Sequence, residues 1–412
     1  MNPWLIFILV VIGAGFLVNT AISLLNLQAL SPTLPEEFSD TYDQEKYRQS
    51  QAYTRVQTIF SVLESSIITA LLLLFLLSGG FNLVDQFVRG FGLGTIPTGI
   101  LYAGLLTLLS SIVGLPFSIY STFKIEAQFG FNRTTAKTYI TDIIKSILLT
   151  IVLGAPILGA ILWFFEYAGS YAWLLCWAGT VAFGFIVQFL APVVIMPLFN
   201  KFTPLEDSPL KDKILTYARL QNFKISGIFT MDGSKRSTKL NAFFTGFGKF
   251  RKIVFYDTLL EKIDDDEIIS VLAHEMGHFK RHHIWKMMAI SILQTGLVFY
   301  LLSLFLNNPG VFAAFKMEHL SIYASLIFFA FLYSPFSTLL SILFNIMLRA
   351  HEFEADRYAA HTTGAPENLV RALKKLSVTN LSNLTPHPAM VFLSYSHPPV
   401  LQRIKALRKV KS

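Results

Sequence analysis

The stretch Val271-Leu-Ala-His-Glu-Met-Gly-His278 contains residues whose types and spacing could hold a metal and move a proton. Four helical residues turn about 400°, so His274 and His278 project from one face of a helix. Two imidazoles placed in this way can bind one zinc ion, with Glu275 beside them to take a proton from zinc-activated water. The alternative is an ordinary amphipathic helix carrying two stacked surface histidines. The pattern therefore predicts a hydrolytic zinc site, provided that the rest of a site is present.

A catalytic zinc of this kind needs a third protein ligand and one open coordination position. A third histidine six residues after the second, as in metzincins, is excluded because position 284 is Ile and position 281 is Arg. The remaining downstream residues with suitable side chains are His282, His283, His351, Glu352 and Glu354.

Glu352 is the best of these candidates, because an apolar hairpin returns it to the side of the membrane that holds the two histidines. The four-residue spacing of Glu352 and Asp356 places both on one helical face. We expect Glu352 to bind the metal and Asp356 to orient a ligand. Glu354 points to the opposite side and is expected to be a solvated charge. Solvent or packing roles are expected for the other histidines, His282, His283 and His351.

The composition indicates that lipid surrounds the elements that must position these residues. Of 412 residues, 53% are hydrophobic and 15% are charged, whereas soluble domains carry about 25% charge. The single cysteine, Cys176, excludes a disulfide framework and a thiolate zinc cluster. We attribute the net charge of +8 to membrane topology, because no basic stripe with interleaved aromatic residues suggests nucleic acid as a partner.

Seven apolar segments are long enough to cross a bilayer. The first has more than twenty residues, no preceding basic residue and no small-residue cleavage site, so we expect a span and not a removed signal peptide. The segments are residues 3–27, 57–79, 99–121, 146–165, 171–197, 284–307 and 322–348.

Lysine and arginine residues are concentrated in the loops on one side of these seven spans. That side holds the loops 28–56, 122–145 and 198–283 and the basic tail, whereas the other side offers only Arg89 and Lys316. The asymmetry predicts an N-terminus outside and a C-terminus in the cytoplasm. Glycosylation at any of the three sequons would contradict this orientation. They begin at Asn132, Asn380 and Asn383.

The pattern predicts a mainly α, polytopic membrane protein with a small β-sheet. Strand-like runs occur at 227–232, 240–246 and 252–257, and the capping-box pattern Asp264–Glu267 precedes the helix of the zinc motif. We divide the chain into five spans with their loops, a polar protease segment, spans six and seven, and a second polar protease segment with the third ligand. The ranges are 1–197, 198–283, 284–348 and 349–412.

Several linked motifs accompany the zinc pattern along nearly the whole chain. They are Thr122-Phe-Lys-Ile-Glu126, Phe129-Gly-Phe-Asn132, Pro197-Leu-Phe-Asn-Lys-Phe-Thr-Pro-Leu-Glu206, Asp232-Gly-Ser-Lys-Arg-Ser237, Asn241-Ala-Phe, Phe255-Tyr-Asp-Thr-Leu-Leu260, Glu352 to Asp356, Ser396-His-Pro398 and Arg403-Ile404. With these motifs the chain resembles the type I CAAX prenyl protease family of integral-membrane zinc metalloproteases. The combination is far more specific than His-Glu-x-x-His alone.

The resemblance implies seven helices around an intramembrane chamber, with a gluzincin-like protease domain on the cytoplasmic side. It implies one zinc per chain, held by His274, His278 and Glu352, and Glu275 as the general base. The substrate would be a peptide or lipidated protein that loses its C-terminal tripeptide next to membrane lipid.

Three further residues receive roles from the resemblance. Asn241, on the strand expected to hold extended substrate, and His397 would stabilise the oxyanion, and Arg403 would order the site through Asp356. From the residues alone an oxyanion donor is needed opposite the base, but a His-Pro turn histidine such as His397 is as often structural.

Two other classes remain as alternatives. A heat-shock membrane metalloprotease would share the zinc motifs and the protease core, but it would have fewer spans and would degrade misfolded membrane proteins. The motifs in 122–132 and 197–237 favour the prenyl-protease type. A seven-span transporter or receptor would require intramembrane charge pathways, which the sequence lacks. The tail Lys409-Val-Lys-Ser412 lacks a dilysine retrieval arrangement, which favours a bacterial plasma-membrane homologue over one of the endoplasmic reticulum. The oligomeric state is open.

Overall fold

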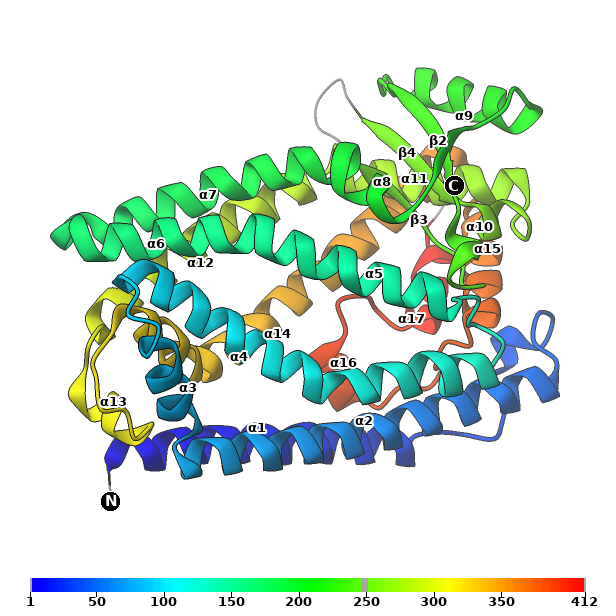
Figure 1. The fold of residues 1–412 in the computed structure, drawn as a ribbon. Coiled ribbons are helices and arrows are strands. Elements are labelled where there is room, and N and C mark those ends of the chain that lie inside the picture. The colour runs from blue at the N-terminus through cyan, green and yellow to red at the C-terminus, as the bar shows by residue number, and fades with distance from the viewer. Residues whose placement is uncertain (1, 246–250, 411–412) are drawn as a thin grey trace.

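The computed structural model describes residues 2–245 and 251–410 as long helices with a small sheet at one end (Figure 1). The predicted mainly α class is therefore confirmed. The first helix begins at one end of the molecule, and the sheet lies at the other end (Figure 1). Gly246, at the end of the predicted strand 240–246, and the last two residues of the basic tail lie outside the described residues.

Within the described residues, seven helical rods are long and apolar enough to cross a membrane, and each corresponds to one predicted span. Three of them contain a short π-helical segment, which extends α4 at its C-terminal end and joins successive helices into one rod in the other two. The rods are α1 (Pro3–Gln28), α2 (Gln44–Ser78), α4 (Thr95–Tyr120) with Ser121–Glu126, α5 (Ala136–Leu149) with Thr150–Gly154 and α6 (Ala155–Tyr167), α7 (Ala172–Leu190) with Ala191–Ile195 and α8 (Met196–Phe199), α12 (His283–Phe305), and α14 (Ile322–Thr363).

These rods have little buried surface. In the most apolar window of each rod, at most 17% of the residues are buried. A tightly packed helical bundle would bury an apolar stripe on every helix. The low burial therefore agrees with helices arranged around a chamber, with one face toward lipid and another toward the interior.

A four-stranded sheet in the order β1-β2-β4-β3 lies beside the ends of several rods. β2 and β4 are parallel, and the two outer strands pair antiparallel to their neighbours. Three strands match the predicted runs. The short β1 was not predicted, because three residues ending in proline carry no strand signal. The strands are β1 (Phe202–Pro204), β2 (Gly227–Met231), β3 (Ala242–Thr245) and β4 (Lys252–Tyr256).

The zinc-motif helix α11 (Asp265–Lys280) begins at the predicted capping box. The side chain of Asp264 accepts a hydrogen bond from the backbone amide of Glu267, and the side chain of Glu267 accepts one from the backbone amide of Asp264. The remaining described helices are shorter than the rods. They are α3 (Gly80–Arg89), α9 (Pro209–Leu220), α10 (Asp257–Leu260), α13 (Pro309–Ala314), α15 (Pro366–Thr379), α16 (Pro388–Ser394), α17 (Val400–Leu407) and short 3-10 turns at Glu36–Phe38, Gly169–Tyr171 and Gly233–Lys235.

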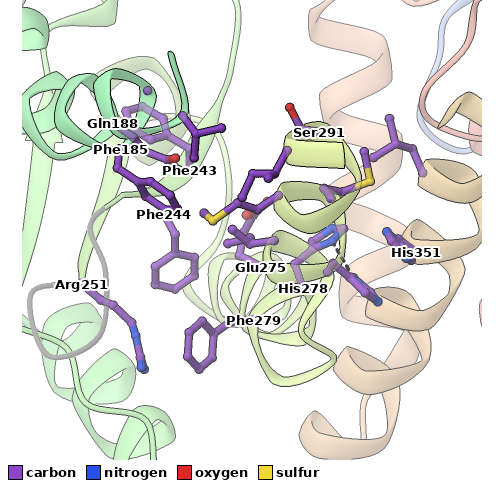
Figure 2. Close-up of a pocket in the computed structure, with 18 of the residues that line it drawn as sticks. Phe185, Gln188, Phe243, Phe244, Arg251, Glu275, His278, Phe279, Ser291 and His351 are labelled. Atoms are coloured by element: carbon purple, nitrogen blue, oxygen red, sulfur yellow. Dashed lines mark hydrogen bonds between the residues drawn. The ribbon is translucent and has the colours of Figure 1, made fainter. Parts of the chain in front are cut away.

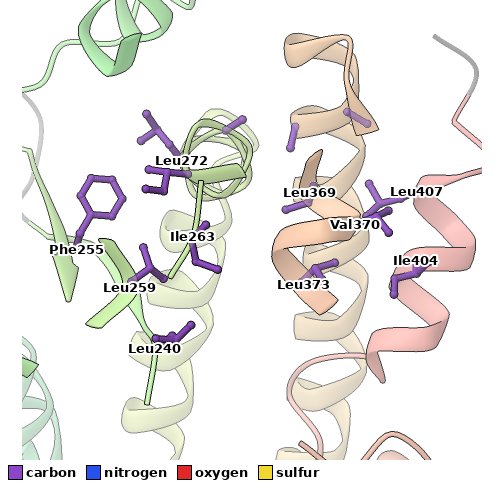
Figure 3. Packing of buried hydrophobic residues seen from close by; sticks show 14 of the residues in the cluster. Leu240, Phe255, Leu259, Ile263, Leu272, Leu369, Val370, Leu373, Ile404 and Leu407 are labelled. Atoms are coloured by element: carbon purple, nitrogen blue, oxygen red, sulfur yellow. The ribbon is translucent and has the colours of Figure 1, made fainter. Parts of the chain in front are cut away.

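One hydrophobic core joins the two polar segments of the chain (Figure 3). Phe255 of β4 and Leu272 of α11 come from the first segment, and Leu373 of α15 and Ile404 of α17 come from the second. Helix α14 runs without a break from the membrane-spanning region into this core. The expected division at 348–349 thus falls inside one helix, which connects the metal-site residues rigidly to a span.

Candidate active site

The site forms where α11 and α14 approach closely. A Cβ atom added to Gly277 would lie 2.9 Å from Ala355 Cα and 3.1 Å from the Ala355 carbonyl oxygen, so only glycine fits. This contact brings the turn of α11 that carries His274 and His278 against the turn of α14 that carries Glu352.

His274, His278 and Glu352 direct their ligand atoms at one point, and all these atoms lie within 4.8 Å of one another. The two Nε2 atoms are 3.2 Å apart. Glu352 Oε1 is 3.2 Å from His278 Nε2, and Glu352 Oε2 is 3.5 Å from His274 Nε2. Ligands about 2.0–2.1 Å from a tetrahedral zinc are separated by roughly 3.3 Å. The three residues therefore fit a zinc ion.

The bonding state of Glu352 supports the same conclusion. Glu352 is only 5% exposed, and its Oε2 forms no hydrogen bond within the described part of the chain, although Arg403 Nη1 lies 3.1 Å away. A buried carboxylate oxygen without a hydrogen bond is costly. Coordination of a metal ion would satisfy this atom.

Asp356 and Arg403 support His274 from the side opposite its Nε2. Asp356 Oδ1 lies 2.8 Å from His274 Nδ1, and Arg403 donates two hydrogen bonds to the Asp356 carboxylate, at 2.8 Å and 2.6 Å. Burial alone would lower the pKa of His274, but Asp356 and Glu352 raise it to about 9. Burial also opposes the charge on Arg403, yet Asp356 raises its pKa. The site is thus strongly attractive to a cation, and the His274 ring is held in one orientation.

Glu275 and His278 line a cavity of about 780 Å³ (Figure 2). Its walls come from α7, from β3, from the end of α11 and from α12, and they are largely apolar. Among the wall residues are Phe185, Phe243, Phe244, Phe279, Met287 and Met288. The cavity therefore joins the metal-site residues to a surface made partly by membrane helices.

His397 reaches this site from the C-terminal segment, whereas Asn241 forms no hydrogen bond to the metal-site residues within the part of the chain that the structure describes. The Nε2 atom of His397 is 3.4 Å from Glu352 Oε1, and its ring is largely exposed. Asn241 directly precedes β3, is exposed, and accepts the backbone amide of Ala242 with its side-chain oxygen. The structure thus brings His397 to the ligand cluster and leaves Asn241 at the edge of the sheet.

Glu354 differs from the expectation of a solvated charge. Its Oε2 lies 3.0 Å from Nε2 of His283, which is buried, and the ring of His283 stacks on that of His351. The spacing of residues along α14 shows which helical face carries Glu354, but it does not show that α12 packs beside that face. The adjacent histidines after the zinc motif were the available signal, but their partner could not be identified without the tertiary contact.

A His-His-Glu cluster in which His274 and Glu352 are buried and His278 is half-buried, with an adjacent glutamate, lies at the end of seven membrane helices and defines an integral-membrane zinc metallopeptidase. Residues 23–201 match the family described as CAAX prenyl protease N-terminal, five membrane helices, and residues 204–411 match peptidase family M48. The chain belongs to this family of CAAX prenyl proteases, as the sequence motifs predicted.

Similar proteins extend over the whole chain. A CAAX prenyl protease 1 homolog of rice is 37% identical, covering 92% of this chain and 91% of the relative. CAAX prenyl protease 1 of Saccharomyces cerevisiae is 35% identical, covering 98% and 95%. The crystal structure of S. mikatae Ste24p matches with a TM-score of 0.93 at 33% identity, covering 99% of each chain. These relatives are eukaryotic, and the bacterial origin favoured by the tail stays a prediction.

Proposed function

We propose that this protein is a zinc endopeptidase that removes the C-terminal tripeptide from prenylated CAAX-type proteins or related peptides. The observation that carries the proposal is the largely apolar cavity beside Glu275 and His278, which α7 and α12 help to form. An isoprenyl group is apolar and gains free energy by leaving water for such a surface. The names of the full-length relatives support the same substrate class.

One zinc ion, held by His274, His278 and Glu352, would supply Lewis-acid chemistry that activates water and polarises the scissile carbonyl. Asp356 accepts a hydrogen bond from the Nδ1–H of His274, which keeps the proton on Nδ1 and the Nε2 lone pair directed at the metal. Arg403 orders the carboxylate of Asp356 by its two hydrogen bonds.

Glu275 acts first as general base and then as general acid. It takes a proton from the water that attacks the peptide carbonyl carbon, and it delivers that proton to the leaving nitrogen as the C–N bond breaks. Its position next to His274 on α11, within the cavity wall, supports this role.

β3 is an outer strand of the sheet and pairs with β4 on one side. An extended substrate could add to its other side through backbone hydrogen bonds. Asn241, at the start of this edge, and His397, near Glu352, would then donate hydrogen bonds to the oxyanion that forms at the attacked carbonyl.

The proposed topology has the N-terminus outside, the protease domain and C-terminus in the cytoplasm, and membrane lipid around the seven rods. The excess of lysine and arginine on the side of the protease domain supports this orientation. The hydrogen bonds that Asn380 exchanges with Leu240 also support it, because they leave no room for a glycan on this sequon.

The test compares three substrates with the purified protein: a farnesylated CAAX peptide, its unprenylated form and an unstructured membrane-protein fragment. Selective cleavage of the farnesylated peptide is expected. Preference for the unstructured fragment would instead indicate a heat-shock type of quality-control protease and would refute the proposal.

Two variants test the assigned roles in the same assay. Glu275→Gln should keep one zinc per chain but lose about 10²–10⁴-fold in turnover, as loss of a general base predicts. Glu352→Ala should lose zinc as well as activity. Full peptidase activity in Glu275→Gln, or wild-type zinc content in Glu352→Ala, would contradict the corresponding role.

A further inference from the structure

A row of hydrogen-bonded side chains, His278, His283 and Glu354, extends away from the centre of the metal site. His278 Nδ1 lies 3.0 Å from His283 Nδ1, and His283 Nε2 lies 3.0 Å from Glu354 Oε2. The three residues come from three elements, namely α11, the first turn of α12, and α14. The Nδ1 atom of His278 thus has a hydrogen-bond partner, as the Nδ1 atom of His274 has in Asp356. For His278, however, a second imidazole lies between the ring and the carboxylate.

The local backbone places His283 in this position. His282 has a left-handed conformation, with φ of 59°, and it separates the end of α11 from the start of α12. The reversal returns the first side chain of α12 toward the last turn of α11. His283 is only 3% exposed, and its ring stacks on His351 at a centroid distance of 3.9 Å and an interplanar angle of 8°.

One arrangement of protons gives each ring nitrogen of His278 and His283, and the Glu354 carboxylate, a suitable partner. If His278 uses Nε2 as a ligand, its Nδ1 carries the hydrogen and donates it to His283 Nδ1. His283 must then carry its own hydrogen on Nε2, which donates to the carboxylate of Glu354. The opposite tautomer of His283 would place two N–H groups face to face and leave the carboxylate without a donor.

We propose that His283 is a positioning residue that holds His278 with its Nε2 directed at the metal, and that Glu354 selects the required tautomer of His283. His351 contributes a flat surface that keeps the His283 ring in plane. The inference rests on the metal ligation of the proposed function, and it assigns to His283 and Glu354 an effect on metal affinity that is independent of the substrate.

The experiment measures the zinc dissociation constant of the full-length detergent-purified protein by competition with a chelator. His283→Ala is expected to weaken zinc binding by about 10–100-fold, the usual effect of losing a residue that orients a ligand. His283→Asn offers an amide oxygen near the position of Nδ1 and should recover part of the affinity. Glu354→Ala should weaken binding, whereas Glu354→Gln, which can still accept the hydrogen bond, should have a smaller effect.

Two control variants separate positioning from packing. His282→Asn changes the adjacent exposed histidine to a residue that tolerates the left-handed conformation, and it should leave zinc affinity unchanged. His351→Phe keeps a stacking ring for His283 and should weaken zinc binding far less than His283→Ala does. Absorption bands of the cobalt(II)-loaded protein, which respond to ligand geometry, should change in His283→Ala and not in His282→Asn.

Wild-type zinc affinity in His283→Ala would overturn the inference. A second result would also overturn it. If His283→Ala lowers both the zinc affinity and the thermal unfolding midpoint in chelator, and His283→Asn restores neither, then His283 acts through packing alone. His274→Ala distinguishes a failure of the underlying metal site: if this variant still binds zinc normally, the proposed ligand set is wrong.

Discussion

Replacement of Gly277 with alanine is expected to weaken zinc binding, because it would force α11 away from α14. The new Cβ atom would lie 2.9 Å from Ala355 Cα, 3.1 Å from the Ala355 carbonyl oxygen and 3.2 Å from Tyr358 Cβ. Carbon atoms prefer separations of about 3.5–4.0 Å. Two of these three atoms belong to the backbone of α14, so relief requires a relative displacement of the helices by roughly 0.5–1 Å.

Two opposing terms decide the effect on stability. Alanine is better than glycine in a helix by about 1 kcal/mol, whereas overpacking a close contact costs about 1–3 kcal/mol. The net loss of folding free energy should therefore be at most about 2 kcal/mol. The metal site is more sensitive, because ligand distances in a well-formed site vary by only about 0.2 Å. A displacement of α11 moves two ligands away from the third, and we expect at least a tenfold loss of zinc affinity, or about 1.4 kcal/mol.

The assay is the zinc dissociation constant of the purified variant, accompanied by its thermal unfolding midpoint in chelator. The matched control is Gly104→Ala in α4, where an added Cβ meets nothing within 4 Å. This control should bind zinc as the wild type does. Zinc affinity of Gly277→Ala within twofold of wild type would refute the view that this helix contact sets the ligand geometry.

Three further changes test other parts of the site and its support. Arg403→Leu leaves the buried carboxylate of Asp356 without its cation and should cost about 3–5 kcal/mol, measured as a lower unfolding midpoint; an unchanged midpoint would argue against this role. Asn380→Leu removes both hydrogen bonds to the loop that leads into β3 and should cost about 1–3 kcal/mol per unsatisfied group, with faster hydrogen exchange in that loop. Burial opposes the charge of Glu37, but Lys374 lowers its pKa below the usual 4.5. The stability that this pair contributes is therefore present above about pH 4.5 and is lost as the pH falls through the lowered pKa of Glu37. Thermal melts between pH 3 and 6 should show this loss in the wild type, and the Glu37→Gln variant should lack this part of the pH dependence.

Local sequence patterns predicted the large elements because hydropathy and capping act over neighbouring residues. The seven spans depend on runs of apolar residues whose length matches the bilayer, and all seven are present in the described residues. The start of α11 was predicted at Asp264, where the capping box satisfies backbone amides within one turn. The three-residue β1 escaped prediction because its pairing with β2, and not its own composition, makes it a strand.

In the site, too, some features follow from local sequence patterns and others depend on tertiary contacts. The sequence by itself determined the His274–His278 pair, the adjacent Glu275, and the common face of Glu352 and Asp356, since each depends on the periodicity of a single helix. The order of the spans also determined that the second polar segment returns to the side that holds the first.

Only the tertiary structure decided how these helices meet. The glycine contact at Gly277 sets the distance between α11 and α14. The reversal at His282 turns His283 toward His278, so Glu354 becomes a partner of that histidine and not the solvated charge that its own helix suggests. The physical reason is that ligand orientation depends on contacts between elements far apart in the chain. Neither periodicity nor hydropathy records such contacts.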